Sequence, residues 1–305
     1  MMKRVLLTAA LSLSVASPAL AASILYGTDN AATYTINTTT GVATLIGSNG
    51  LSGFGADGYG TILRDLTSTP SKLYGAQWTF ASTGITGAVA TVDAVTGAVT
   101  ASASLTGLLE TGFNQGLYSL AFDTSTNTLY GNTARRLYTI DPATGATTFV
   151  GDLVPGSIVG LGIDASTGTL FSISQIVDAA GATTTLMRTL SKSDGSILST
   201  ITLANQCNCD IAFDPLTNRG YISSAITDAD GNILSTQLDV LNSSLSGTTI
   251  VGSHGAAAAP FGMSGLAFFG TSAPVPEATT WAMMITGFGL AGFSLRRSKR
   301  IIATV

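Results

Sequence analysis

Acid–base chemistry in this chain would depend on a few carboxylates, because the 305 residues include one histidine, His254. A glycoside hydrolase or lyase needs two carboxylates facing each other at about 5 to 9.5 Å. A Ser-His-Asp site would have to use His254, and nothing near it resembles a nucleophile elbow. The sequence therefore predicts no enzyme. A carbohydrate-active enzyme is the alternative, with its pair drawn from Asp57, Asp65, Glu110, Asp152 and Asp210.

The two cysteines, Cys207 and Cys209, are one residue apart. In an oxidising compartment they are expected to form a local disulfide, although a bridge spanning one residue is strained. Free thiols and a metal pair are the alternatives, and a four-ligand zinc site would need carboxylates from elsewhere. The Asp228–Asn232 segment looks like a calcium loop, but its glycine stands at the fourth position, where an EF-hand needs it at the sixth. The sequence therefore predicts neither a cofactor nor a metal.

One short unit recurs along the chain, and its clearest copy spans residues 119–153. Runs rich in Tyr, Phe, Ile, Val and Thr alternate with Gly, Asn, Asp and Pro, and the runs are too short for helices. In the turns an Asp or Asn is followed by Thr and then by Gly or Asn, as in Asp141, Thr144 and Gly145. The carboxylate accepts backbone hydrogen bonds, and the last residue tolerates positive φ. These carboxylates are therefore predicted to cap turns rather than to bind calcium.

Five copies of the unit fill residues 22–270. The first copy opens at Ile24 on the unit's second strand, and a solitary first strand, residues 263–269, follows the fifth copy. A β-propeller closes its ring in this way, because the terminal strand completes the opening blade and leaves no free sheet edge. The sequence therefore predicts an all-β chain, a β-propeller of five four-stranded blades. Six or seven blades and a β-sandwich are the alternatives.

In such a ring the fourth-to-first and second-to-third connections lie on one face, and binding sites concentrate on loops of this kind. The second-to-third connections include Arg136. The ligand rim predicted on the fourth-to-first connections consists of Asp57, Glu110, Asp152 and His254.

The first 21 residues have the pattern of a secretory signal peptide. A basic start precedes an apolar run, and Ala19 and Ala21 form the small-x-small cleavage site. We therefore expect export through the Sec translocon.

The other end is predicted to anchor the chain in the inner membrane. After a linker at residues 271–278, residues 279–295 carry no charge and would form a helix about 25 Å long. Four basic residues within 296–300 would hold the C-terminus on the cytoplasmic side, so the propeller would face the periplasm.

The tail VPEATTWAMMITGFGLAGFSLRRSKR resembles the PEP-CTERM sorting signal of Gram-negative bacteria, with Ala278 in place of the second proline. The resemblance implies processing by an exosortase, after which the protein reaches the cell surface or the medium. It also implies an association with extracellular polysaccharide, and similar tails occur on proteins described as ice-binding. The residues that match the signal are Pro276, Glu277, Trp281, Arg296, Arg297, Lys299 and Arg300.

Between the two ends, residues 22–277 carry 7 Lys and Arg against 17 Asp and Glu, a net charge of −10. Such a surface argues against nucleic acid and against anionic polymers as direct partners, although counter-ions could bridge to polysaccharide. We therefore expect an exported, non-catalytic propeller that binds or scaffolds extracellular polysaccharide or envelope proteins. Ice binding is a further alternative, but it needs flat threonine ladders, whereas these threonines are largely in turns.

Overall fold

The computed structural model describes residues 23–110, 114–153, 157–177, 183–203, 210–227, 233–242, 245, 247–255 and 263–270. These residues belong to one compact unit, residues 22–270, and the described part consists of strands and turns. Among the described residues no helix is long and apolar enough to cross a membrane. The predicted signal peptide, both cysteines and the predicted tail helix with its sorting motif lie outside the described residues.

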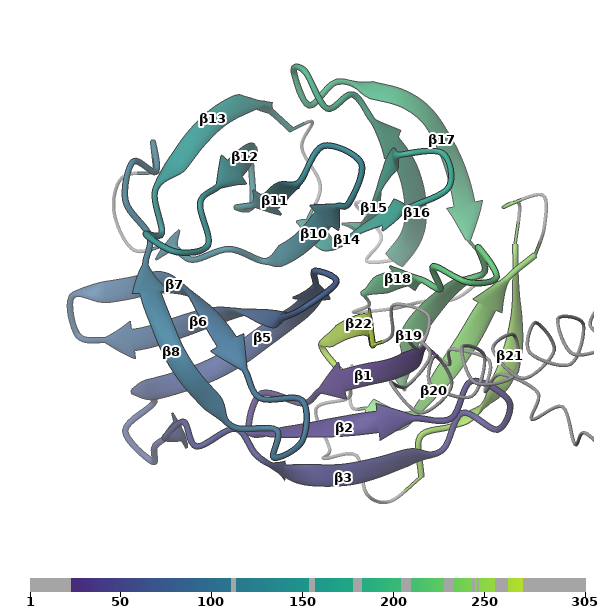
Figure 1. Ribbon diagram of the computed structural model, residues 1–305, viewed down its shortest axis with the longest axis horizontal. Coiled ribbons are helices and arrows are strands. Elements are labelled where there is room, and N and C mark those ends of the chain that lie inside the picture. The colour runs from purple at the N-terminus through teal and green to yellow at the C-terminus, as the bar shows by residue number, and fades with distance from the viewer. Residues whose placement is uncertain are drawn as a thin grey trace, which may run out of the picture. The chain divides into compact units, whose positions relative to one another are not determined.

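The chain forms a five-bladed β-propeller, in which antiparallel sheets surround a common axis (Figure 1). Blade 1 contains β22 (Gly265–Phe269), β1 (Ile24–Thr28), β2 (Ala32–Ile36) and β3 (Ala43–Ser48). Blade 2 contains β5 (Gly60–Ser68), β6 (Leu73–Ala81), β7 (Gly84–Val92) and β8 (Val99–Ser104), with the two-residue strands β4 (Gly53–Phe54) and β9 (Asn114–Gln115) added to it.

The other three blades follow the repeat without added strands. Blade 3 contains β10 (Ser119–Asp123), β11 (Thr128–Asn132), β12 (Arg136–Ile140) and β13 (Thr147–Asp152). Blade 4 contains β14 (Ser157–Asp164), β15 (Thr169–Val177), β16 (Thr183–Leu190) and β17 (Ile197–Leu203). Blade 5 contains β18 (Ile211–Phe213), β19 (Gly220–Thr227), β20 (Ile233–Leu241) and β21 (Thr248–Ser253).

The ring closes through β22, the last strand, which pairs antiparallel with β1, the first. Five residue pairs join them, from Ile24 opposite Phe269 to Thr28 opposite Gly265. Figure 1 shows β22 as the inner strand of the blade that β1, β2 and β3 complete. The predicted five blades and the predicted closing strand are therefore confirmed.

The hairpin turns have the predicted chemistry. Asp141 accepts the backbone N–H of Ala143 at 2.9 Å and the hydroxyl of Thr144 at 2.8 Å, and Gly145 has a φ of 74°. Asn127 and Asn218 take the same position in other turns with φ of 53° and 56°. The aspartates of these turns thus act as turn caps, which explains why the motif recurs in every blade.

Apolar side chains fill the spaces between neighbouring blades. Between blades 1 and 2, for example, Tyr26 and Ala267 meet Leu63, Leu66 and Val92, all buried. Fully burying a leucine or valine side chain stabilises the fold by about 1.5–3 kcal/mol. Each blade contributes to two such layers. The first strand of every blade lies along the axis (Figure 1), and these strands are β22, β5, β10, β14 and β18.

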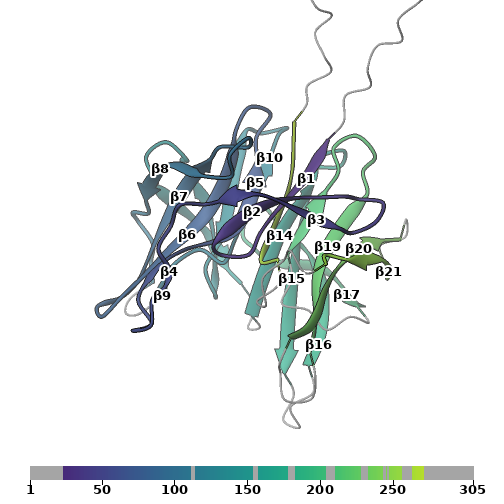
Figure 2. The same cartoon turned by 90° about the horizontal axis from the view of Figure 1, so that it is seen from below.

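The face that carries the second-to-third and fourth-to-first connections is called the loop face below. Figure 2 shows the ring from the side, and this face is the lower one, where β15 ends, β16 begins, and β4 and β9 lie. The predicted ligand rim belongs to this face.

Candidate functional site

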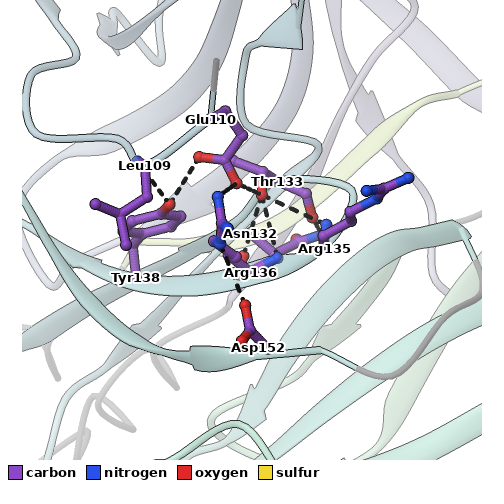
Figure 3. A network of polar contacts seen from close by, with 8 residues as sticks. All are labelled: Leu109, Glu110, Asn132, Thr133, Arg135, Arg136, Tyr138 and Asp152. Carbon is purple, nitrogen blue, oxygen red and sulfur yellow. Dashed lines mark hydrogen bonds and ion pairs between the residues drawn. The ribbon is translucent and has the colours of Figure 1, made fainter.

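Glu110 occupies the centre of a polar network on the loop face between blades 2 and 3 (Figure 3). It follows β8, whereas its partners come from blade 3. Its Oε1 accepts a hydrogen bond from the Thr133 hydroxyl at 2.5 Å, and its Oε2 accepts one from the Tyr138 hydroxyl at 2.7 Å. The Arg136 guanidinium approaches Oε1 to 3.6 Å. Blade 3 therefore holds both oxygens of this carboxylate.

Arg136 also joins Glu110 to a second predicted rim residue. Its Nε donates to Asp152 Oδ1 at 3.2 Å, and this hydrogen bond together with the Glu110 charge raises the pKa of Arg136. The Asp152 side chain is 76 % exposed, so solvent screens this pair. The structure thus brings Glu110 and Asp152 to one arginine, with Asp152 at the solvent edge.

The Tyr138 hydroxyl links the network to the backbone. Burial, followed by the hydrogen bond to Glu110, raises the pKa of Tyr138 to about 12, so the phenol stays protonated and donates to Glu110. The same oxygen accepts the backbone N–H of Leu109 at 3.0 Å. Because its oxygens are already bound on both sides, Glu110 fixes the connection between blades 2 and 3 and is poorly placed to act as an acid or base.

The other two predicted rim residues do not join this network. Asp57 is exposed and accepts the backbone N–H of Tyr59 within its own turn. His254 is fully buried: its Nδ1 lies 2.9 Å from the Gly41 carbonyl oxygen and its Nε2 lies 3.2 Å from the Ser223 hydroxyl. Burial lowers the pKa of His254, so the ring is neutral, and its proton must be on Nδ1 because a carbonyl can only accept. His254 therefore connects blade 5 to blade 1.

Two carboxylates from the predicted pool, Asp65 and Asp210, meet at the axis, and both are fully buried. Asp65 Oδ2 accepts the Ser119 hydroxyl at 2.6 Å and the backbone N–H of Leu120 at 2.5 Å. Asp210 Oδ2 accepts the backbone N–H of Leu266 at 2.6 Å. Both carboxyls lie against the single Ser119 hydroxyl, which is 3.4 Å from Asp210 Oδ1, so no sugar ring fits between them.

We call Asp65, Ser119 and Asp210 the axial cluster. Ser119 Oγ also accepts the backbone N–H of Leu161 at 2.7 Å, so the cluster binds groups on β5, β10, β14 and β22 and just before β18. Every blade thus contributes to it.

The two axial carboxyls are both buried and both lie within 3.4 Å of the Ser119 hydroxyl. Two negative charges this close in a buried site repel each other, so one of the two carboxyls is expected to carry a proton. Burial raises the pKa of Asp65 to about 6, and burial together with the Asp65 charge raises the pKa of Asp210 well above its usual value. With one carboxyl neutral, both aspartates can be buried at the axis. The axial cluster then holds the blades together through its hydrogen bonds.

One polar residue that the sequence did not mark as functional is Arg64, next to Asp65 on β5. Its guanidinium lies against the rings of Trp78 and Tyr118. The sequence signal that could have pointed to it is an Arg-Asp pair between the apolar residues Leu63 and Leu66, because charged side chains are rarely buried unless they are paired. Among the described residues, no group of three or more His, Cys, Asp or Glu side chains could hold a metal ion.

No family model and no curated protein matches the chain. Solved structures resemble it at low identity. A structure described as a nidogen/laminin complex is 11 % identical, with a TM-score of 0.48 over 81 % of this chain and 98 % of that chain. The PQQ-bound aldose sugar dehydrogenase of Streptomyces coelicolor is 12 % identical, with a TM-score of 0.42 over 74 % of this chain and 76 % of that chain. A putative 6-phosphogluconolactonase of Bacteroides uniformis is also 12 % identical, with a TM-score of 0.37 over 76 % and 82 %. Likenesses this distant carry no conclusion about activity.

Proposed function

We propose that this chain is exported and serves as a non-catalytic, surface-associated propeller that binds extracellular polysaccharide. The observation that carries the proposal is the combination of a closed ring with a C-terminal segment that resembles the PEP-CTERM sorting signal. Proteins with that signal are associated with the cell surface and extracellular polysaccharide. The tail would therefore direct the protein to the surface, and the propeller would provide a rigid face for binding.

A binding role rather than hydrolysis is supported by the state of the carboxylates. Asp65 and Asp210 are buried against Ser119, and Glu110 is bound by Thr133 and Tyr138. Each of these carboxylates is therefore held by a structural partner. A glycosidase instead needs a pair of carboxylates with room for a sugar between them.

We expect the form that cells release to have lost both ends and to be retained on the producer's own extracellular polysaccharide. Intact mass should place one cut after Ala21 and the other near Pro276 and Glu277. The same sample, passed over immobilised polysaccharide with and without calcium, should be retained without releasing new reducing ends. Heat-denatured protein is the control.

Absence of retention at every calcium level would overturn the binding role, and release of reducing ends would make the protein an enzyme. A chain that stays inside the cell with both ends intact would overturn the proposed export.

A further inference from the structure

Arg64 stands at a β-bulge in β5. Leu63 pairs with Gln77 and Asp65 pairs with Ala76, so Arg64 is the extra residue between them. A bulge bends the strand and redirects the side chain of the extra residue. The corresponding irregularity in β14 leaves Val159 unpaired, and Val159 packs in the apolar core. The fold therefore accepts an apolar residue at such a bulge, and the charge of Arg64 is particular to blade 2.

Two aromatic rings hold the Arg64 guanidinium. Its central carbon lies 4.9 Å from the ring centre of Trp78 and 5.2 Å from that of Tyr118, and the two rings are nearly perpendicular at 87°. Trp78 is itself fixed, because its Nε1 donates to the Leu117 carbonyl at 2.5 Å. A Cβ at Gly116 would lie 2.5 Å from that nitrogen, so glycine is needed there for the ring to approach the backbone. The guanidinium is thus positioned before any ligand arrives.

No described residue accepts a hydrogen bond from this positioned cation. Among the described residues no carboxylate forms an ion pair with Arg64, and its Nε is buried without a hydrogen-bond partner. Asp65, the next residue, instead directs its carboxylate to Ser119 and Leu120. Burial lowers the pKa of Arg64, but an arginine remains protonated at neutral pH. Burying part of a cation without an acceptor costs free energy. The half-buried Arg64 guanidinium therefore favours binding of an anionic ligand to its N–H groups.

A row of aromatic side chains leads from this cation to the solvent. The ring centre of Phe80 lies 5.8 Å from that of Trp78, and the ring centre of Phe54 lies 4.8 Å from that of Phe80. Phe54, on β4, is 53 % exposed. Aromatic rings provide flat apolar surfaces on which the C–H face of a sugar ring packs. The exposed end of the row therefore offers an aromatic surface, and its buried end, at Trp78, lies beside the cation.

We propose that Arg64, Trp78, Tyr118, Phe80 and Phe54 form a binding site for a carboxylated sugar, a hexuronate residue within a polysaccharide. The planar guanidinium matches a carboxylate with paired hydrogen bonds, and the aromatic row accepts the neighbouring sugar rings. The net charge of −10 over residues 22–277 repels a densely charged polyanion, so the ligand carries its carboxylates sparsely. This assignment rests on the proposed function and names its site and ligand class.

The test is titration calorimetry of the full chain, purified in a mild detergent, with an oligosaccharide containing one hexuronate and with its neutral glucose counterpart. We expect the acidic oligosaccharide to bind more tightly than the neutral one. Arg64→Met should weaken acidic binding about tenfold or more and remove the preference, whereas Arg64→Lys should restore part of it because it keeps the charge without the fork. Phe54→Ala should weaken both ligands alike.

Arg136→Met is the matched control, because Arg136 lies on the same face and is already paired with Glu110 and Asp152. It should leave the preference for the acidic ligand unchanged. Thermal unfolding of each variant shows that it is folded.

Equal binding of the acidic ligand by the native chain and by Arg64→Met, or equal binding of both ligands by the native chain, would overturn the assignment. The proposed function would still stand if the Arg64→Met chain were retained on the producer's polysaccharide as well as the native chain. Failure of the native chain to bind that polysaccharide would remove both.

Discussion

Replacing Asp210 with asparagine is expected to stabilise the protein more at about pH 8 than at about pH 5, and to change its stability little at about pH 4 or below. Asp210 lies fully buried against Asp65, and burial raises the pKa of both carboxyls. The unfolded chain releases both protons near pH 4, whereas the folded chain retains them to higher pH. The free energy of unfolding therefore falls as the pH rises through the folded-state pKa values.

The asparagine replaces a neutral carboxyl with a neutral amide of the same shape. Its carbonyl can accept the backbone N–H of Leu266, and its amide can donate to Asp65 Oδ1, a buried oxygen to which no described residue donates in the native chain. For Asp65 alone, a pKa of about 6 corresponds to a loss of about 3 kcal/mol between pH 4 and pH 7, and burial is its cause. The asparagine leaves that loss in place and removes the further loss that comes from Asp210 itself, whose pKa is raised by burial and by the Asp65 charge.

Urea unfolding of the native chain and of Asp210→Asn across this pH range measures the effect. Asp141→Asn is the control, because Asp141 is an exposed turn cap whose pKa is lowered by the backbone N–H of Ala143. Its stability difference from the native chain should not vary between about pH 5 and pH 8. A constant difference for Asp210→Asn as well would show that the axial cluster holds no shared proton.

Adding one methyl group at Gly265 is expected to destabilise the ring by about 1–3 kcal/mol or more. Gly265 begins β22, and a Cβ there would lie 2.5 Å from Asp65 Cα and 2.6 Å from Leu66 N. Both contacts are with backbone atoms of β5, so no side chain can rotate away. The closing strand would move from the axis and weaken the hydrogen bond from Leu266 to Asp210.

The free energy of unfolding of Gly265→Ala, again from urea denaturation, checks this expectation. Gly247→Ala is the matched control, since among the described residues a Cβ there meets Asn242 Nδ2 alone, at an ordinary 3.5 Å. We expect the control to lie within about 0.5 kcal/mol of the native chain. Equal stability of the two variants would mean that β22 does not press against β5 as described.

The repeat and its closure could be predicted from the sequence because their signals are local. Each turn cap acts over a few residues, as at Asp141, and the missing first strand before Ile24 and the extra strand ending at Phe269 are both visible in the sequence. The short strands β4 and β9 were not predicted, because two residues carry no periodic pattern.

The contacts of the candidate sites could not be predicted in the same way. Asp65 and Asp210 meet only because the ring brings β5 and β18 to the axis, and a bulge such as that at Arg64 leaves no mark in the sequence. Glu110 and Asp152 meet through Arg136, and that contact depends on how blade 3 is placed. His254 was expected on the rim and is buried, because Gly41 and Ser223 satisfy its ring nitrogens.

The closed ring can be tested by asking whether the two ends of the propeller pair. Ile24 lies opposite Phe269 in the β1–β22 ladder, and residues directly opposite in an antiparallel pair are close enough for a disulfide. In a chain with serine at positions 207 and 209, Ile24→Cys with Phe269→Cys is predicted to form an intramolecular disulfide under mild oxidation, detected by mass. The control pair, Ile24→Cys with Leu198→Cys on β17 of blade 4, is predicted to stay reduced. A reduced 24–269 pair in the folded protein would contradict the closed ring.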